Sequence, residues 1–212
     1  MRHCSAGGHV DNRCELEYND SGIRVAKTDF EDVNSDGDFD DTGTDTSVRT
    51  DYHVDHRNPT GYAQVLEEMQ GAAVVKSYTI GHDVFVEAVS ANQVRRLLTD
   101  GHGSTRALVD ALGVVIQSGS TPQIYAYDAY GNALGFDPAT AATDFLYSGE
   151  HTDSTGLQYL RARYYNPATG RFNRLDPFAG NMQDPQSLHK YLYCHANPVN
   201  GIDPTGELLS FL

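Results

Sequence analysis

A short turn pattern, Asp-x-x-Gly followed by an apolar or β-branched step, recurs along the chain and limits what it can fold into. The pattern occurs at Asp100/Gly103, Asp110/Gly113, Asp128/Gly131, Asp153/Gly156 and Asp203/Gly206. In such a turn the aspartate accepts backbone N–H bonds, and the glycine takes the positive φ that closes the turn. The repeat therefore predicts a series of β-hairpins. Because one hairpin is marginally stable alone in water, the hairpins must join a common sheet.

The residues between these turns favour strands. Alternating apolar runs predict strands at residues 73–85, 95–98, 112–116, 123–127 and 157–165. Only residues 186–193 have helical spacing, with Leu188, Tyr191 and Leu192 at i, i+3 and i+4; Asp184 or Ser187 would cap this helix. The predicted fold class is all-β, with one short helix near the C-terminus.

Charge and hydropathy exclude several function classes. The 15 Lys and Arg residues against 29 Asp and Glu residues give a net charge of -14, without a basic patch to attract a phosphate backbone. We therefore expect no nucleic-acid binding. No apolar run approaches the length of a membrane span, and the first residues contain no secretory h-region. Cys4, Cys14 and Cys194 cannot all pair, so they are free thiols or form one incidental bridge.

Three segments carry a resemblance to a known family. Residues 125–132 (YAYDAYGN) resemble the tyrosine–aspartate (YD) repeat, and residues 156–172 (GLQYLRARYYNPATGRF) resemble the signature of the RHS repeat-associated core. Residues 190–206 are similar to the close of that core. The resemblance implies YD-repeat hairpins in a curved sheet, which is part of a hollow RHS shell. It divides the chain into YD-repeat-like strands at 1–97 with an acidic insertion at 29–45, the core at 98–206, and a tail at 207–212.

The family resemblance also implies a function. The chain would be a non-catalytic terminal part of the shell, which closes around or encapsulates a C-terminal toxin or effector segment. Its partners would be the remaining shell strands or a cargo chain, and its location the outside of the cell or the cell surface. Since the sequence has no leader, it is either cytoplasmic or a truncated reading frame. Unpaired edge strands predict that the isolated chain self-associates.

Two other functions stay open at this stage. The first is an extracellular binding or adhesion module, in which a tyrosine-rich sheet face contacts glycans with the help of calcium. The second is a relic of a self-cleaving toxin of the wall-associated tRNA nuclease type. In that family the nuclease lies after the core, so we expect no nuclease activity from this chain.

The acidic insertion contains a candidate calcium loop. Oxygen ligands at loop positions 1, 3, 5, 7 and 9 are spaced as in EF-hands, dockerins and thrombospondin type 3 repeats: Asp32, Asn34, Asp36, Asp38 (through its carbonyl) and Asp40. Gly37 would make the sharp turn. Gly43 replaces the bidentate glutamate of position 12, which predicts weak Ca²⁺ binding. The other interpretation is a solvated acidic connection between two strands.

Asp176 and Asp203, each followed by proline, are the candidate catalytic residues. They match the paired Asp-Pro motifs at the end of the RHS core, and the resemblance implies an aspartyl pair for self-cleavage, in which one carboxylate activates water and the other is protonated. The first motif is one residue longer than the family pattern, and residues 181–190 lengthen the interval. The alternative is that both aspartates cap turns.

Histidine and the mixture of tyrosine with arginine have simpler interpretations. The nine histidines are spaced unlike metal ligands, and those at 82, 102 and 151 follow turn signals, so scattered surface histidines are expected. Tyrosines and arginines alternate over residues 159–174, which predicts cross-strand stacking of tyrosine with arginine rather than a ligand platform.

Overall fold

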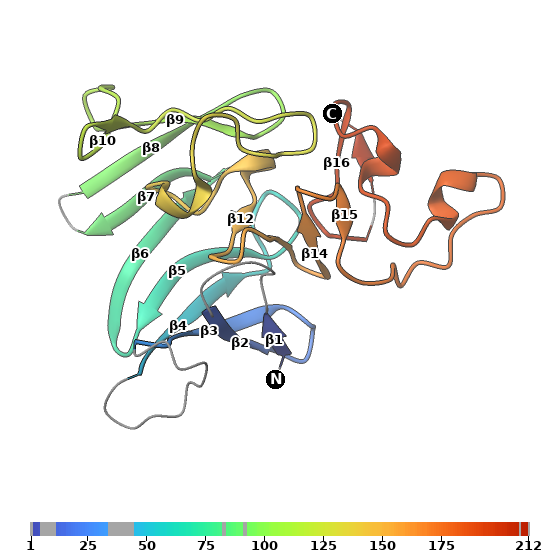
Figure 1. Ribbon diagram of the computed structural model, residues 1–212, viewed down its shortest axis with the longest axis horizontal. Coiled ribbons are helices and arrows are strands. Elements are labelled where there is room, and N and C mark those ends of the chain that lie inside the picture. The colour runs from blue at the N-terminus through green and yellow to red at the C-terminus, as the bar shows by residue number, and fades with distance from the viewer. Residues whose placement is uncertain are drawn as a thin grey trace.

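The computed structural model describes residues 2–4, 12–33, 45–81, 84–90, 93–207 and 209–211. Nine strands form one antiparallel sheet in sequence order, each paired with the next (Figure 1). They are β1 (Arg2–Cys4), β2 (Asn12–Tyr18), β3 (Arg24–Glu31), β4 (Thr46–Asp55), β5 (Gln64–Gln70), β6 (Ala73–Ile80), β7 (Val84–Ser90), β8 (Gln93–Thr99) and β9 (Thr105–Val109). The sheet is curved, so the predicted chain of hairpins in a curved all-β fold is confirmed.

The rest of the chain forms small antiparallel units and short 3-10 turns. The strands are β10 (Gln117–Ser118), β11 (Thr121–Pro122), β12 (His151–Thr152), β13 (Gln158–Leu160), β14 (Arg163–Asn166), β15 (Arg171–Phe172), β16 (Gly201–Ile202) and β17 (Ser210–Phe211). The turns are η1 (Pro138–Thr140), η2 (Tyr147–Gly149), η3 (Pro185–Leu188) and η4 (Cys194–Ala196). Strands β12 to β15 form a four-stranded sheet. Within the described ranges no helix has the length and apolarity to cross a membrane.

The repeated turn works as the sequence predicts. The Asp100 carboxylate accepts the N–H groups two and four residues later, at 2.9 and 3.0 Å. Asp110 and Asp128 repeat this geometry within 2.8–2.9 Å, and Asn19 does so at 3.0 Å. Each of these turns closes through a glycine at positive φ. The turn aspartates therefore replace backbone acceptors that the tight turn cannot supply.

The core lies between one face of the large sheet and the segments that follow it. Tyr78, Leu97 and Leu108 of the sheet pack against Phe145 and Leu146. A second cluster belongs to the small sheet and the chain end, where the rings of Tyr165 and Tyr193 stack at 4.0 Å. A third joins the first strands to β13 and β14 through Leu16, Tyr159 and Tyr164. The segments after β9 are thus packed against the large sheet at the first and third clusters, while the second cluster packs the small sheet against the chain end.

Several local predictions need correction. Residues 112–116 and 123–127 form isolated bridges rather than strands, and residues 157–165 form two strands around Arg161 at φ 57°. The predicted helix is only the turn η3, because the chain near Tyr191 pairs instead with β15: Phe172 N donates to Tyr191 O at 3.0 Å. Cys14 is disulfide-bonded and lies opposite Cys4 in the β1–β2 register, while Cys194 is free and buried.

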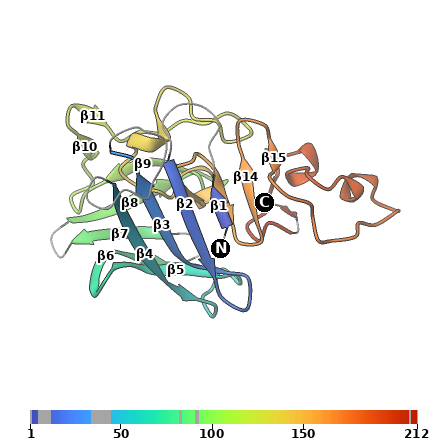
Figure 2. The same ribbon diagram turned by 60° about the horizontal axis from the view of Figure 1, so that its bottom comes forward.

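One segment projects from the body. Residues 177–189, which we call the arm, extend away from the sheets in Figures 1 and 2. Its base is closed by a hydrogen bond from Asp176 N to Lys190 O at 2.9 Å. The arm contains most of the residues that lengthen the interval between the two Asp-Pro motifs. The sheet runs through residue 109, so the predicted boundary between 97 and 98 falls within β8, and the division into domains stays a prediction.

Candidate functional site

The two candidate catalytic aspartates meet at one arginine. Nη2 of Arg163 lies 2.9 Å from Oδ2 of Asp176 and 3.5 Å from Oδ2 of Asp203. The Arg163 side chain is 1% exposed, against 15% for Asp176 and 5% for Asp203. Although 27 positions separate the aspartates, the structure brings both carboxylates to the same guanidinium edge.

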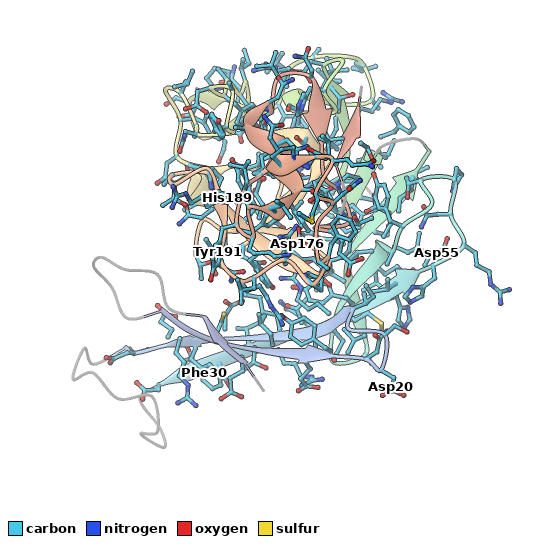
Figure 3. The ribbon with its side chains drawn as sticks, turned by 90° about the vertical axis from the view of Figure 1, so that its right-hand side faces the viewer. Asp20, Phe30, Asp55, Asp176, His189 and Tyr191 are labelled. Carbon is cyan, nitrogen blue, oxygen red and sulfur yellow. The ribbon has the colours of Figure 1, made fainter. Side chains whose placement is uncertain are left out.

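Local turns fix each member of this trio. Asp176 follows β15, and its Oδ1 accepts the N–H of Phe178 at 2.8 Å. Asp203 follows β16, and its Oδ1 accepts the N–H of Glu207 at 3.1 Å. Arg163 begins β14, lies over the ring of Phe172 at 3.6 Å, and donates from Nε to the carbonyl of Gly206. Each aspartate thus uses one oxygen for its turn and turns the other toward Arg163 (Figure 3 labels Asp176).

The charges in this trio determine its chemistry. An arginine stays protonated in proteins, so one positive charge lies against both carboxylates. An aspartyl pair that splits a peptide bond needs one carboxyl protonated, to polarise the carbonyl, and one ionised, to activate water. The structure therefore brings both carboxylates to one cation, whereas catalysis would also require a proton on one of them.

A large cavity opens beside the trio. Its volume is about 1110 Å³, and it lies between the β2–β3 turn, the loop before β5, and the β14–β15 hairpin with its continuation. Arg163, Arg171, Arg174 and Glu207 line it together with the ring of Tyr62. Arg163 lines the cavity, whereas Asp176 and Asp203 do not; only neighbours of the aspartates, among them Leu175 and Thr205, do.

The candidate calcium ligands are only partly described. Asp32 lies just after β3. Asn34, Asp36, Asp38 and Asp40 lie outside the described residues. Asp45, immediately before β4, accepts the N–H of Val33 at 3.3 Å, so the two ends of the acidic connection are close together. The calcium loop stays a prediction.

A second cluster of charges, absent from the sequence predictions, joins the sheet to the following segments. Arg24 of β3 is 1% exposed, and its Nη1 lies 2.7 and 2.8 Å from the two oxygens of Asp153. The guanidinium also stacks on the rings of Tyr52 and Tyr159 at 4.7 and 4.4 Å. Burial alone would raise the pKa of Asp153, but Arg24 and His151 hold it well below its usual range.

This cluster continues along the sheet, and we call it the charged seam. Its members are the side chains of Arg24, Glu68, Lys76, Glu87, Arg95, Asp144, His151 and Asp153. Sequence reasoning placed His151 among surface histidines, and this was wrong, because residue 151 is 9% exposed and starts β12. The signal in the sequence was Arg24 itself. It lies on the same strand face as Ala26, and a charged residue on an apolar strand face indicates a buried ion pair.

Part of the seam has the composition of a metal site. Glu68, Asp144 and His151 each offer a ligand atom, and these atoms lie within 4.8 Å of one another. However, Lys76 already forms an ion pair with Asp144 and approaches Glu68 to 4.0 Å. The chain itself thus supplies the positive charge that these carboxylates require.

Comparison with known proteins places this geometry in context. No family model matches the chain. It is 35% identical over 138 residues to the tRNA3(Ser)-specific nuclease WapA of Bacillus spizizenii, which covers 63% of this chain and 6% of that protein. It is 31% identical over 140 residues to the double-stranded DNA deaminase toxin A of Burkholderia cenocepacia, covering 64% of this chain and 9% of that one. The chain thus spans less than a tenth of the length of either relative.

Solved structures share the fold. The crystal structure of TcdB2-TccC3 matches with a TM-score of 0.62 at 22% identity, over 96% of this chain and 10% of that one. The Tc holotoxin pore of Photorhabdus luminescens matches with a TM-score of 0.63 at 20% identity, over 99% of this chain and 9% of that one. With the repeated Asp-x-x-Gly hairpins and the core signature at 156–172, these similarities identify the chain as an RHS-repeat protein.

Proposed function

We propose that the chain forms the closing end of an RHS shell that encloses a toxin or effector segment, on the outside of the cell or at its surface, and that this end is itself not an effector enzyme. One observation carries the proposal. Two relatives with unlike activities in their names, a tRNA nuclease and a DNA deaminase, each match about two thirds of this chain.

The overlap between these matches supports a shared structural role. Stretches of 138 and 140 residues within a chain of 212 must overlap, so part of this sequence is common to both relatives. A segment shared by proteins that act on different nucleic acids is better suited to holding an effector than to performing either reaction. The net charge of -14 agrees with this, since it repels RNA and DNA alike.

A chimera tests the proposal. In TcdB2-TccC3 the segment that matches this chain would be replaced by residues 1–212, and protease protection of the material that follows would be measured. A closing role predicts protection equal to that in the parent complex. A matched chimera carrying Tyr165→Ala, which removes a fully buried ring from the small-sheet core, should lose this protease protection. Digestion at the rate of a complex that lacks the segment would refute the proposal.

The trio of Arg163, Asp176 and Asp203 supports a second candidate function, self-cleavage after the core. Both aspartates lie within 3.5 Å of one guanidinium nitrogen, and that arginine lines the large cavity. In this proposal the cavity receives the peptide, and acid protonates one carboxyl while the other activates water. Cleavage would therefore require a pH low enough to protonate one carboxyl of the pair.

A further inference from the structure

The charged seam holds two parts of the molecule together. Arg24, Glu68, Lys76, Glu87 and Arg95 come from strands β3, β5, β6, β7 and β8 of the large sheet, whereas Asp144, His151 and Asp153 come from the segment packed on it. His151 contacts Arg24 and Glu68 across this boundary. A change in the charge of His151 therefore acts directly on the joint between sheet and segment.

His151 is surrounded mainly by carboxylates. Its Nδ1 lies 3.3 Å from Oδ1 of Asp153, and its Nε2 lies 3.8 Å from Oε1 of Glu68 and 4.0 Å from Oδ2 of Asp144. One cation faces it, Arg24, whose Nη2 is 3.4 Å from Nδ1. The apolar contacts are the rings of Tyr52 and Phe145, which meet the imidazole edge to face at 6.3 and 5.6 Å.

The seam contains more acidic groups than permanently charged basic ones. Glu68, Glu87, Asp144 and Asp153 are its four carboxylates, and Arg24, Lys76 and Arg95 are its three fixed cations. The two oxygens of Glu87 accept no hydrogen bond, and lie 3.8 Å from Lys76 and 3.7 Å from Arg95. Burial raises the pKa of Glu87, so the balance is drawn over the charged groups nearest His151. There the carboxylates of Glu68, Asp144 and Asp153 face the fixed cations Arg24 and Lys76, and a proton on His151 makes these charges equal. Since unbalanced buried charge is costly, this protonated state is the favoured one.

We propose that protonated His151 is a latch that holds the segment containing residues 144–153 against the large sheet, and that loss of its proton loosens this joint. Deprotonation would leave Glu68, Asp144 and Asp153 facing a neutral ring, with Arg24 and Lys76 to offset them. Lys27 also acts on Asp153, but its ammonium is paired with Asp29 at 2.8 Å. These three carboxylates would then repel one another across the boundary between the sheet and the segment, and this local repulsion would loosen the joint.

The direction of the pH effect follows from the surroundings. Burial alone would lower the pKa of His151, but hydrogen bonding with Asp153 and Glu68 raises it above its ordinary value near 6.5. A raised pKa in the folded state means that the stabilisation is complete below about pH 6.5 and is lost as the pH rises through the folded value. Burial raises the pKa of the Cys194 thiol to about 12, so this thiol does not titrate in the same window.

Thermal unfolding of the full chain between pH 5.5 and 9 tests the latch. For each pH unit by which the folded pKa exceeds 6.5, the melting temperature should fall by about 3–5 °C across this window. His151→Gln removes the titrating group at nearly constant volume and should abolish that loss. The matched control is His53→Gln, because His53 also faces a glutamate, at 3.0 Å from Glu67, but is exposed. This control should retain the wild-type dependence.

A second measurement decides the matter if His151→Gln does not fold. In the wild-type protein, NMR titration of the His151 ring should give a pKa above 6.5, and amide exchange at residues 144–153 should accelerate once that value is passed. A ring that titrates at or below 6.5 would overturn the proposal. So would an alkaline loss of stability of equal size in His151→Gln, which would point to another group.

Discussion

Replacing Asp153 with asparagine should destabilise the protein strongly, because it leaves Arg24 buried without its carboxylate. The two side chains are each 1% exposed and are joined by two contacts of 2.7 and 2.8 Å. Their positions are 129 residues apart, so the pair connects β3 with the end of β12. The substitution changes a charge and one atom type while preserving side-chain volume.

The expected cost follows from this burial. Breaking a buried ion pair by removing one partner costs about 3–5 kcal/mol, because the remaining charge is left without compensation. For a chain of this length, that corresponds to a fall in melting temperature of about 6–20 °C. Tyr164, whose hydroxyl lies 3.1 Å from Arg24 Nη1, offers a neutral acceptor and should keep the cost from exceeding this range.

Urea unfolding at pH 6, followed by circular dichroism, measures the change. The matched control is Asp51→Asn, since Asp51 pairs with Arg49 at 2.8 Å but both side chains are more than 40% exposed. Exposed pairs contribute about 0–1 kcal/mol, so this variant should remain near wild type. The double variant Arg24→Met, Asp153→Leu should cost less than Asp153→Asn alone. If Asp153→Asn and Asp51→Asn lose equally little stability, the inference that the buried pair of Arg24 and Asp153 stabilises the contact between β3 and the end of β12 is refuted.

Three further results are expected. Gly206 has φ +70°, and a Cβ there would lie 2.4 Å from Leu160 O, so Gly206→Ala should lower the free energy of unfolding in urea by about 3 kcal/mol. Gly113 has φ +82° but open space around it, so the control Gly113→Ala should lower it by only about 1–2 kcal/mol. Calcium titration should show one weak site that Asp36→Ala abolishes and Asp20→Ala preserves; no heat or NMR shift at about 10 mM calcium would exclude the loop as a site. Mass spectrometry at neutral pH should find the chain intact, because carboxylates are ordinarily ionised at that pH and self-cleavage would need one of the pair protonated. Truncation that Asp203→Asn prevents would contradict this.

The hairpin architecture could be predicted from sequence because its determinants are local. An aspartate and a glycine three residues apart define a turn by themselves, and the carboxylates of Asp100, Asp110 and Asp128 bond as this pattern predicts. The predicted cross-strand stacking of tyrosine with arginine took a different form: Arg163 lies over Phe172, and Tyr159 stacks with Arg24 from the large sheet. The length of the short helix was overestimated, since helical spacing at 188–192 does not reveal that Tyr191 pairs with β15.

The charged contacts could not be predicted in the same way, because they depend on pairs far apart in sequence. Asp153 and Asp203 carry the same turn pattern as Asp110, whose carboxylate accepts the N–H groups of its turn, yet each directs a carboxylate oxygen to a buried arginine. Nothing within four residues distinguishes an aspartate that serves only its turn from one that also binds an arginine. The difference lies in whether folding brings Arg24 or Arg163 to that turn, which a local pattern does not encode.

The closed base of the arm has a practical consequence for labelling the molecule. Since Asp176 N bonds to Lys190 O, the path between them can change length without moving either end. Lengthening such a closed loop is inexpensive, about 0.6 kcal/mol for each doubling. Met182, within the arm, is 89% exposed, and the arm projects away from the sheets (Figures 1 and 2). An epitope tag or a fluorophore inserted beside Met182 would therefore be accessible on this chain, while Asp176 and Arg163 keep their spacing.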